Sequence, residues 1–68
     1  MVVIKWTNRF SGETGFVHSV SAKEKHFNNT YEQNDAHKYV SPAVAKRTIN
    51  SLIGYGEAEN NDFEVVAV

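Results

Sequence analysis

The sequence predicts a small α+β domain of two layers, in which one main helix packs on one face of an antiparallel sheet of three or four strands. Three observations predict this fold. The first ten residues are rich in β-branched and aromatic side chains, a capped helical pattern covers residues 41–54, and the last six residues are rich in valine. A helix with one apolar stripe buries it well against the apolar face of a sheet. We expect residues 1–68 to form a single domain, because no linker or repeat divides them.

Residues 2–10 are predicted to form the first strand. From Val3 onward their side chains alternate between two faces, which is typical of a strand with one buried side. The side that we expect to face the core carries Val2, Ile4, Trp6 and Phe10. Two glycines in residues 11–15 favour a turn, and residues 16–20 return to apolar character. The chain therefore begins with a β-hairpin.

The middle of the chain carries weaker signals. Phe27, Asn29 and Tyr31 are spaced by two and indicate a short third strand, although the surrounding asparagines weaken this interpretation. Residues 34–39 resemble one helical turn opened by an Asx cap. We expect this turn to deliver Tyr39 and Val40 to the core.

The main helix is predicted over residues 41–54. Ser41 suits the N-cap, Pro42 suits the first helical position, and Gly54 suits a left-handed C-cap, while Val40 is placed to contact Ala45 as a hydrophobic staple. The apolar face of this helix is expected to consist of Ala45, Ile49, Leu52 and Ile53.

Residues 63–68 are predicted to form the last strand, after an acidic connection over residues 55–62. We expect this strand to lie beside the first one, because these two segments are the most continuously apolar. The predicted element order is therefore β-β-(β)-α-β.

The composition excludes several classes of function. The chain has no cysteine, so neither disulfides nor thiolate metal sites can form. Its three histidines lack the spacing of a metal-binding helix, and its serines stand in turn, strand or helix positions without the context of an activated nucleophile. We therefore expect a protein that is not an enzyme and that uses no cofactor and no metal.

Two surfaces remain as candidates for binding. The first is an aliphatic patch on the sheet face away from the helix, where a second apolar phase places Val3, Val17, Val66 and Val68. A small chain gains stability by covering such a patch, so the sequence favours a protein partner or a second copy of the chain, as in a homodimer.

The alternative is a nucleic acid bound by the first hairpin and its exit, where aromatic and basic residues interleave. The cations that would contact phosphates are Lys5, Arg9, Lys23 and Lys25. However, the net charge of the chain is −1, and a dedicated nucleic-acid binder is normally strongly basic.

We expect no membrane signal at the N-terminus. Its apolar run, Met1 to Ile4, ends at Lys5 and is too short for a signal-peptide core or a bilayer span. We expect a cytoplasmic protein with no membrane partner.

The stretch from Tyr31 to Ala45, followed by a helix and the closing strand from Phe63 to Val68, resembles short uncharacterised proteins of phages and prophages of Gram-positive bacteria. The shared pattern is an apolar hairpin, an aspartate-alanine turn, an aromatic residue, a serine-capped helix with early alanines and a valine-rich end. The resemblance spans most of the chain and contains no diagnostic motif. It implies an accessory protein of phage type with this fold, and it transfers no catalytic residue.

Overall fold

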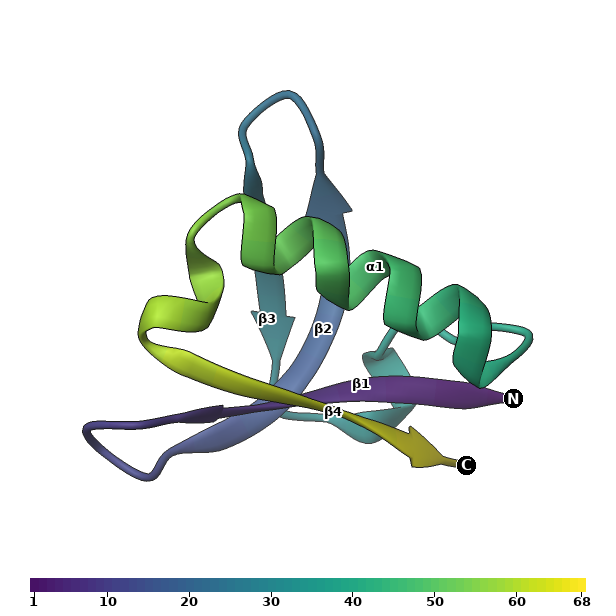
Figure 1. Cartoon of the computed structure of the whole chain (residues 1–68). Coiled ribbons are helices and arrows are strands. Elements are labelled where there is room, and N and C mark those ends of the chain that lie inside the picture. Colours follow the sequence, from purple (N-terminus) through teal and green to yellow (C-terminus); the bar gives the residue numbers. More distant parts are fainter.

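Four antiparallel strands form one sheet in the order β3-β2-β1-β4 in the computed structural model, which describes residues 1–68. A single α-helix, α1, lies on one face, and two short 3₁₀ helices, η1 and η2, flank it in the chain (Figure 1). The bounds of the strands and helices are β1 Val2–Asn8, β2 Thr14–Ser21, β3 His26–Thr30, η1 Gln33–Asp35, α1 Pro42–Gly54, η2 Glu57–Glu59 and β4 Asn61–Ala67. The predicted α+β fold is confirmed, with four strands, and so is the pairing of the last strand with the first.

β1 ends at Asn8, two residues earlier than predicted, because the side chain of Asn8 forms a local turn. Its Oδ1 accepts hydrogen bonds from the backbone N–H groups of Phe10 and Ser11, both at 2.9 Å. Such Asx turns compete with continued strand pairing. Phe10 consequently lies in the turn with 81% of its surface exposed, so its predicted place on the core side is wrong.

The register of the first hairpin is set by the contact between Trp6 and Gly15. These two residues oppose each other across β1 and β2, and Lys5 opposes Phe16. A Cβ added at Gly15 would lie 2.6 Å from the Trp6 ring, so only glycine leaves room for the indole. The indole N–H also donates to the backbone oxygen of Phe16, at 3.2 Å.

β2 carries a bulge that changes which of its side chains face the core. The pairing with β3 shifts register between Val17 and Ser19, so His18 is an extra residue. A bulge interrupts the alternation of a strand and increases its bend. As a result, Val17 and Val20, three residues apart, both pack into the same core. The bend also turns the β2–β3 hairpin away from β1 and β4 (Figure 1).

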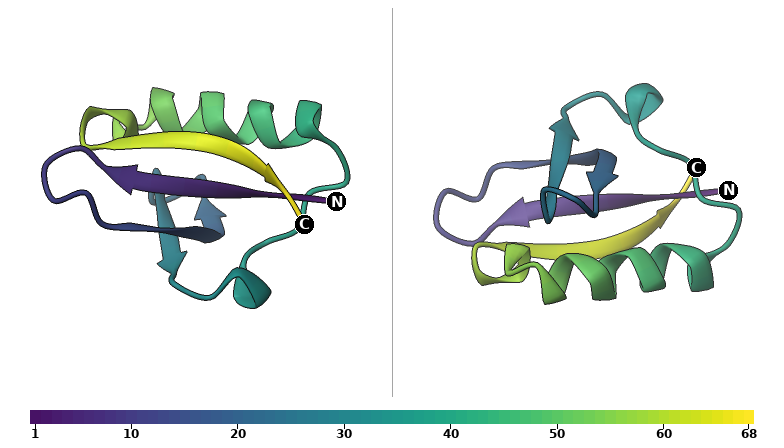
Figure 2. Two further views of the ribbon diagram at one scale, coloured as in Figure 1. Left: turned by 90° about the horizontal axis from the view of Figure 1, so that it is seen from below. Right: turned by 90° about the horizontal axis from the view of Figure 1, so that it is seen from above.

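Residues 37–39 are bonded to both central strands. Val2 and Tyr39 exchange backbone hydrogen bonds of 3.0 and 2.8 Å, and the N–H of His37 donates to the oxygen of Val17 at 3.1 Å. Tyr39 is buried, as predicted, but Val40 is exposed, so its expected burial is wrong. The preceding η1 segment lies on the opposite side of β1 and β4 from α1 (Figure 2).

α1 begins as predicted and ends differently. The Ser41 side chain accepts a hydrogen bond from the N–H of Val44, and Pro42 is the first helical residue. The predicted left-handed cap at Gly54 is wrong, because Gly54 is still helical and Tyr55 is a right-handed cap. The left-handed glycine is Gly56, with φ of 90°, at the start of η2.

The core lies between α1 and the concave face of the sheet. The buried cluster consists of Val2, Ile4, Trp6, Val17, Phe27, Tyr39, Ala45 and Leu52. Ile49 packs against this cluster as expected, whereas Ile53 leaves 52% of its surface exposed and does not belong to the buried stripe.

Candidate functional site

The predicted valine patch is not assembled, because its members occupy three different environments. Val3 is fully buried, and it lies opposite the half-buried Val66 on the sheet face away from α1. Val17 is also fully buried, but it belongs to the core under α1, since the hairpin register places it opposite Ile4. Only Val68 is exposed. The prediction of an exposed four-valine surface is therefore wrong.

The four cations proposed for nucleic-acid binding do not form one free basic surface. Nζ of Lys5 lies 3.9 Å from Oε1 of Glu64, its neighbour on β4. The Arg9 guanidinium contacts Oδ1 of Asp62 through both Nε and Nη2, each at 2.9 Å. Lys23 and Lys25 are in the β2–β3 turn, which projects away from the β1–β2 turn (Figure 1). Two of the four predicted cations are thus paired with acidic side chains of β4.

The outer edge of β4 has no strand beside it. β1 and β4 pair over seven consecutive residues without a bulge. At the two ends of this ladder, Val68 donates to the oxygen of Met1 at 3.2 Å, and Arg9 donates to the oxygen of Asn60 at 2.8 Å. Only alternate residues of an antiparallel pair exchange hydrogen bonds. The backbone N–H and C=O groups of Phe63, Val65 and Ala67 therefore point outward, away from β1.

A groove runs between this edge and α1. It encloses about 540 Å³. Its lining residues are Lys46, Ile49, Asn50, Phe63, Glu64 and Val65. Ile53 follows Asn50 by three residues and so shares that side of the helix, where it extends the apolar lining toward η2. We call the outward backbone of β4 together with this groove the β4 edge surface.

The other edge strand, β3, is a poorer surface for pairing. It has five residues against seven in β4, and its ladder with β2 contains the bulge. Short, bulged edge strands are a common protection against unwanted pairing, whereas long regular edges invite it. Among the two edges, β4 has the geometry that another strand requires.

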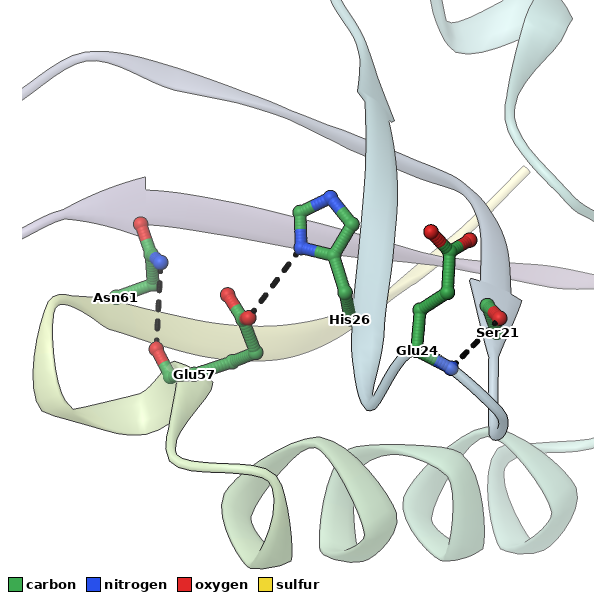
Figure 3. A network of polar contacts seen from close by, with 5 residues as sticks. All are labelled: Ser21, Glu24, His26, Glu57 and Asn61. Atoms are coloured by element: carbon green, nitrogen blue, oxygen red, sulfur yellow. Dashed lines mark hydrogen bonds and ion pairs between the residues drawn. The ribbon is translucent and has the colours of Figure 1, made fainter.

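A second, polar hollow lies between β3 and η2, with a volume of about 270 Å³. In Figure 3, the His26 ring points toward the Glu57 carboxylate, with Nδ1 3.5 Å from Oε1. The side-chain N–H of Asn61 donates to the backbone oxygen of Glu57 at 3.2 Å. These contacts connect β3, η2 and the start of β4. The polar groups at this end of the hollow thus bind each other across three elements.

Tyr31 also lines this hollow. Its hydroxyl donates to Oε2 of Glu13 at 2.7 Å, and its ring meets Trp6 edge-on with centroids 6.0 Å apart. The hydrogen bond to the Glu13 carboxylate favours the neutral phenol and raises the pKa of Tyr31, with smaller contributions from burial and charge.

A third hollow, of about 380 Å³, lies between β2 and α1 and is partly lined by Tyr39 and His37. Their rings meet edge-on at 4.5 Å. Burial raises the pKa of Tyr39 above its usual value of 10.0.

No three histidine, cysteine, aspartate or glutamate side chains lie close enough together to hold a metal ion. No helix has the length and apolar character needed to cross a bilayer. Comparison with family models, with curated proteins and with solved structures finds no match. The fold and its surfaces define a small α+β domain with an open sheet edge.

Sequence reasoning missed the β4 edge surface. Its signal was present in the alternation of the last strand, because Phe63 and Val65 fall on the helix side. Whether one edge of that strand stays unpaired depends on the strand order of the sheet. The sequence predicted the first strand as a neighbour of the last one, but it did not show whether another strand pairs with the other edge.

Proposed function

We propose that this protein acts as a binding module without catalytic activity, and that it binds an extended segment of another protein along the β4 edge surface. The single observation that supports this most strongly is the row of outward backbone groups at Phe63, Val65 and Ala67 beside the apolar groove of α1. Strand addition of this kind takes its affinity from main-chain hydrogen bonds and its specificity from neighbouring side-chain pockets.

The groove beside the edge offers such pockets. Phe63 and Val65 are only partly buried, and Ile53 is exposed, so an added strand would remove apolar surface from water on the side of α1. The acidic side chains of β4, Asp62 and Glu64, lie at the exposed face of the strand. They favour a partner strand with apolar or basic residues opposite them. The expected cytoplasmic location and accessory role of phage type are compatible with such a module and stay predictions.

A synthetic peptide of residues 61–68, acetylated and amidated at its ends, is a suitable strand probe. We expect it to slow amide hydrogen exchange at Phe63, Val65 and Ala67 of the protein, because these N–H groups gain acceptors. The matched control is the same peptide carrying N-methyl groups on those three residues, which keeps the side chains and removes the donors. Equal effects of the two peptides, or protection confined to β3, would contradict strand addition at β4.

The nucleic-acid alternative makes a different prediction. It requires binding of a labelled single-stranded oligonucleotide that weakens steeply with added salt and that is lost in the double variant Lys5→Ala, Arg9→Ala. The ion pairs of these two residues with Glu64 and Asp62 argue against it. Fluorescence anisotropy decides between the two classes of partner.

A further inference from the structure

We infer that the polar hollow between β3 and η2 binds a guanidinium group, carried either by an arginine side chain or by a small guanidino compound. This hollow, of about 270 Å³, shares no lining residue with the groove of the β4 edge surface. The inference therefore goes beyond the proposed strand binding, and either can hold without the other.

The hollow lies on the helix side of the sheet, in a part that α1 leaves uncovered. Trp6 and Phe27 belong to the core beneath α1. Asn8 and Asn29 follow them by two residues, on the same face of β1 and β3. No residue of α1 lines the hollow, whereas Glu57 of η2 does. Pockets for drug-sized ligands enclose about 300–1,000 Å³, so this smaller hollow suits a single small group.

Two carboxylates line the hollow, and neither is paired with a lysine or an arginine. Oε2 of Glu13 accepts the hydroxyl proton of Tyr31 at 2.7 Å, and Oε1 of Glu57 lies 3.5 Å from Nδ1 of His26 (Figure 3). These contacts hold each carboxylate in place and leave its second oxygen without a protein partner. By contrast, the carboxylates of β4 are paired with cations of β1 and of the turn that follows it.

The hollow therefore presents negative charge that no permanently charged group of its lining balances. Its other ionisable groups are the imidazole of His26 and the phenol of Tyr31. The hydrogen bond to Glu13 raises the pKa of Tyr31, so this phenol stays neutral. Concave sites lined by one sign of charge concentrate ions of the opposite sign. A cation is the expected ligand.

The aromatic rings of the hollow favour a guanidinium among cations. Trp6, Phe27 and Tyr31 line it, and the rings of Trp6 and Tyr31 meet edge-on with centroids 6.0 Å apart. A guanidinium is planar and weakly hydrated, stacks on aromatic faces, and has several N–H donors in a fixed fork. Besides the free carboxylate oxygens, it can reach the side-chain oxygen of Asn61, whose N–H group already bonds the backbone of Glu57. An ammonium is more strongly hydrated and has fewer donors, so it gains less.

Methylguanidinium and N-methylurea are matched probes, because they share shape and number of non-hydrogen atoms and differ in charge. The titration is followed by NMR at pH 8, where imidazoles are generally neutral. We expect methylguanidinium to shift the signals of the Trp6 indole N–H and of the Asn61 side-chain amide, with a dissociation constant of about 1–10 mM for so small a ligand. Methylurea should cause no saturable shift.

Three charge-removing variants locate the site. Glu13→Gln and Glu57→Gln should each weaken methylguanidinium binding roughly tenfold, because one hydrogen bond to a charged partner is lost. Glu59→Gln is the matched control, since it removes the same charge from an exposed position of η2 that does not line the hollow. We expect it to change the affinity by less than about twofold, because exposed charges are screened by salt. Circular dichroism checks that each variant folds.

Equal shifts with methylguanidinium and methylurea, or equal losses of affinity in all three variants, would overturn the site. Equally tight binding of methylammonium would overturn the guanidinium as its ligand. N-acetylarginine N-methylamide and free arginine separate the two sources, because the free amino acid adds a carboxylate that the two glutamates repel. Tighter binding of the blocked form assigns the site to an arginine within a peptide chain, and tighter binding of free arginine assigns it to a small molecule.

Discussion

Replacing Gly15 by alanine tests how closely β2 approaches the Trp6 ring. The added Cβ would lie 2.6 Å from Cζ2 and 2.8 Å from Cε2 of Trp6, and 2.9 Å from the backbone oxygen of Thr30. The indole cannot simply move aside, since its N–H is bonded to the Phe16 oxygen and its edge contacts Tyr31. The backbone of Thr30 is held in the β2–β3 ladder. Either the ring or β3 must therefore shift.

The cost of this shift follows from the general penalty of overpacking a core, which is about 1–3 kcal/mol. For a domain of this size a urea slope of about 1 kcal/mol per molar is expected, so the midpoint of unfolding falls by roughly 1–3 M. Equilibrium unfolding in urea, followed by the fluorescence of Trp6 as the single tryptophan, measures this change. The emission of the folded variant also reports whether the indole has moved.

Gly54→Ala is the matched control for the same chemical change. A Cβ at Gly54 meets nothing within 4 Å, and this residue lies in the last turn of α1. Alanine is about 1 kcal/mol better than glycine inside a helix, so we expect unchanged or higher stability. If Gly15→Ala were as stable as the wild type, the close approach of Trp6 to β2 and the hairpin register built on it would be refuted.

Three further predictions concern stability. Ser41→Ala should lower the free energy of unfolding by about 1 kcal/mol, because the N–H of Val44 loses its cap; no change in a denaturant titration would contradict this role. Val3→Ala should lower the free energy of unfolding by about 2 kcal/mol because Val3 is fully buried, whereas Val68→Ala should change it by no more than about 0.5 kcal/mol. Equal losses of stability in paired thermal melts would contradict these burials. Because the pKa of Tyr39 is raised in the folded protein, the stability that its neutral phenol contributes is complete below the unfolded pKa of 10.0 and is lost as pH rises through the higher folded pKa. Tyr39→Phe should therefore flatten the alkaline fall in stability, measured by urea titrations at a series of pH values. An unaltered pH profile would count against the buried phenol.

The elements with strong local signals were predicted well. Ser41 and Pro42 fix the start of α1 through a side-chain cap and a preset φ, and both effects act within a few residues. The pairing of β4 with β1 was also predicted, because two long apolar strands bury most when they are adjacent.

The predictions of side-chain burial were wrong where a residue distant in sequence, a β-bulge or a side-chain turn determines which way a strand residue faces. Val17 was assigned to the wrong face because nothing local shows that Gly15 must accommodate Trp6, which sets the register. The bulge at His18 then brings Val20 to the same side, and a bulge has no simple sequence pattern. Phe10 was misplaced because the Asx turn of Asn8 ends the strand before it.

The candidate site was the least predictable part. The valine patch was deduced from alternation alone, whereas exposure depends on strand order, on the η1 segment and on the twist of the sheet. The β4 edge surface becomes visible only when β4 is known to have one neighbour, since the sequence is the same for a central strand and for an edge strand.

Amide hydrogen exchange along β4 tests the central claim most directly. Measured with rising amounts of the 61–68 peptide, the amides of Phe63, Val65 and Ala67 should become more protected. The amides of Glu64 and Val66, already bonded to β1, serve as the internal reference and should change little. If the three outward amides exchange at the same fast rate at every concentration of the peptide, then β4 accepts no strand and the account of this surface is contradicted.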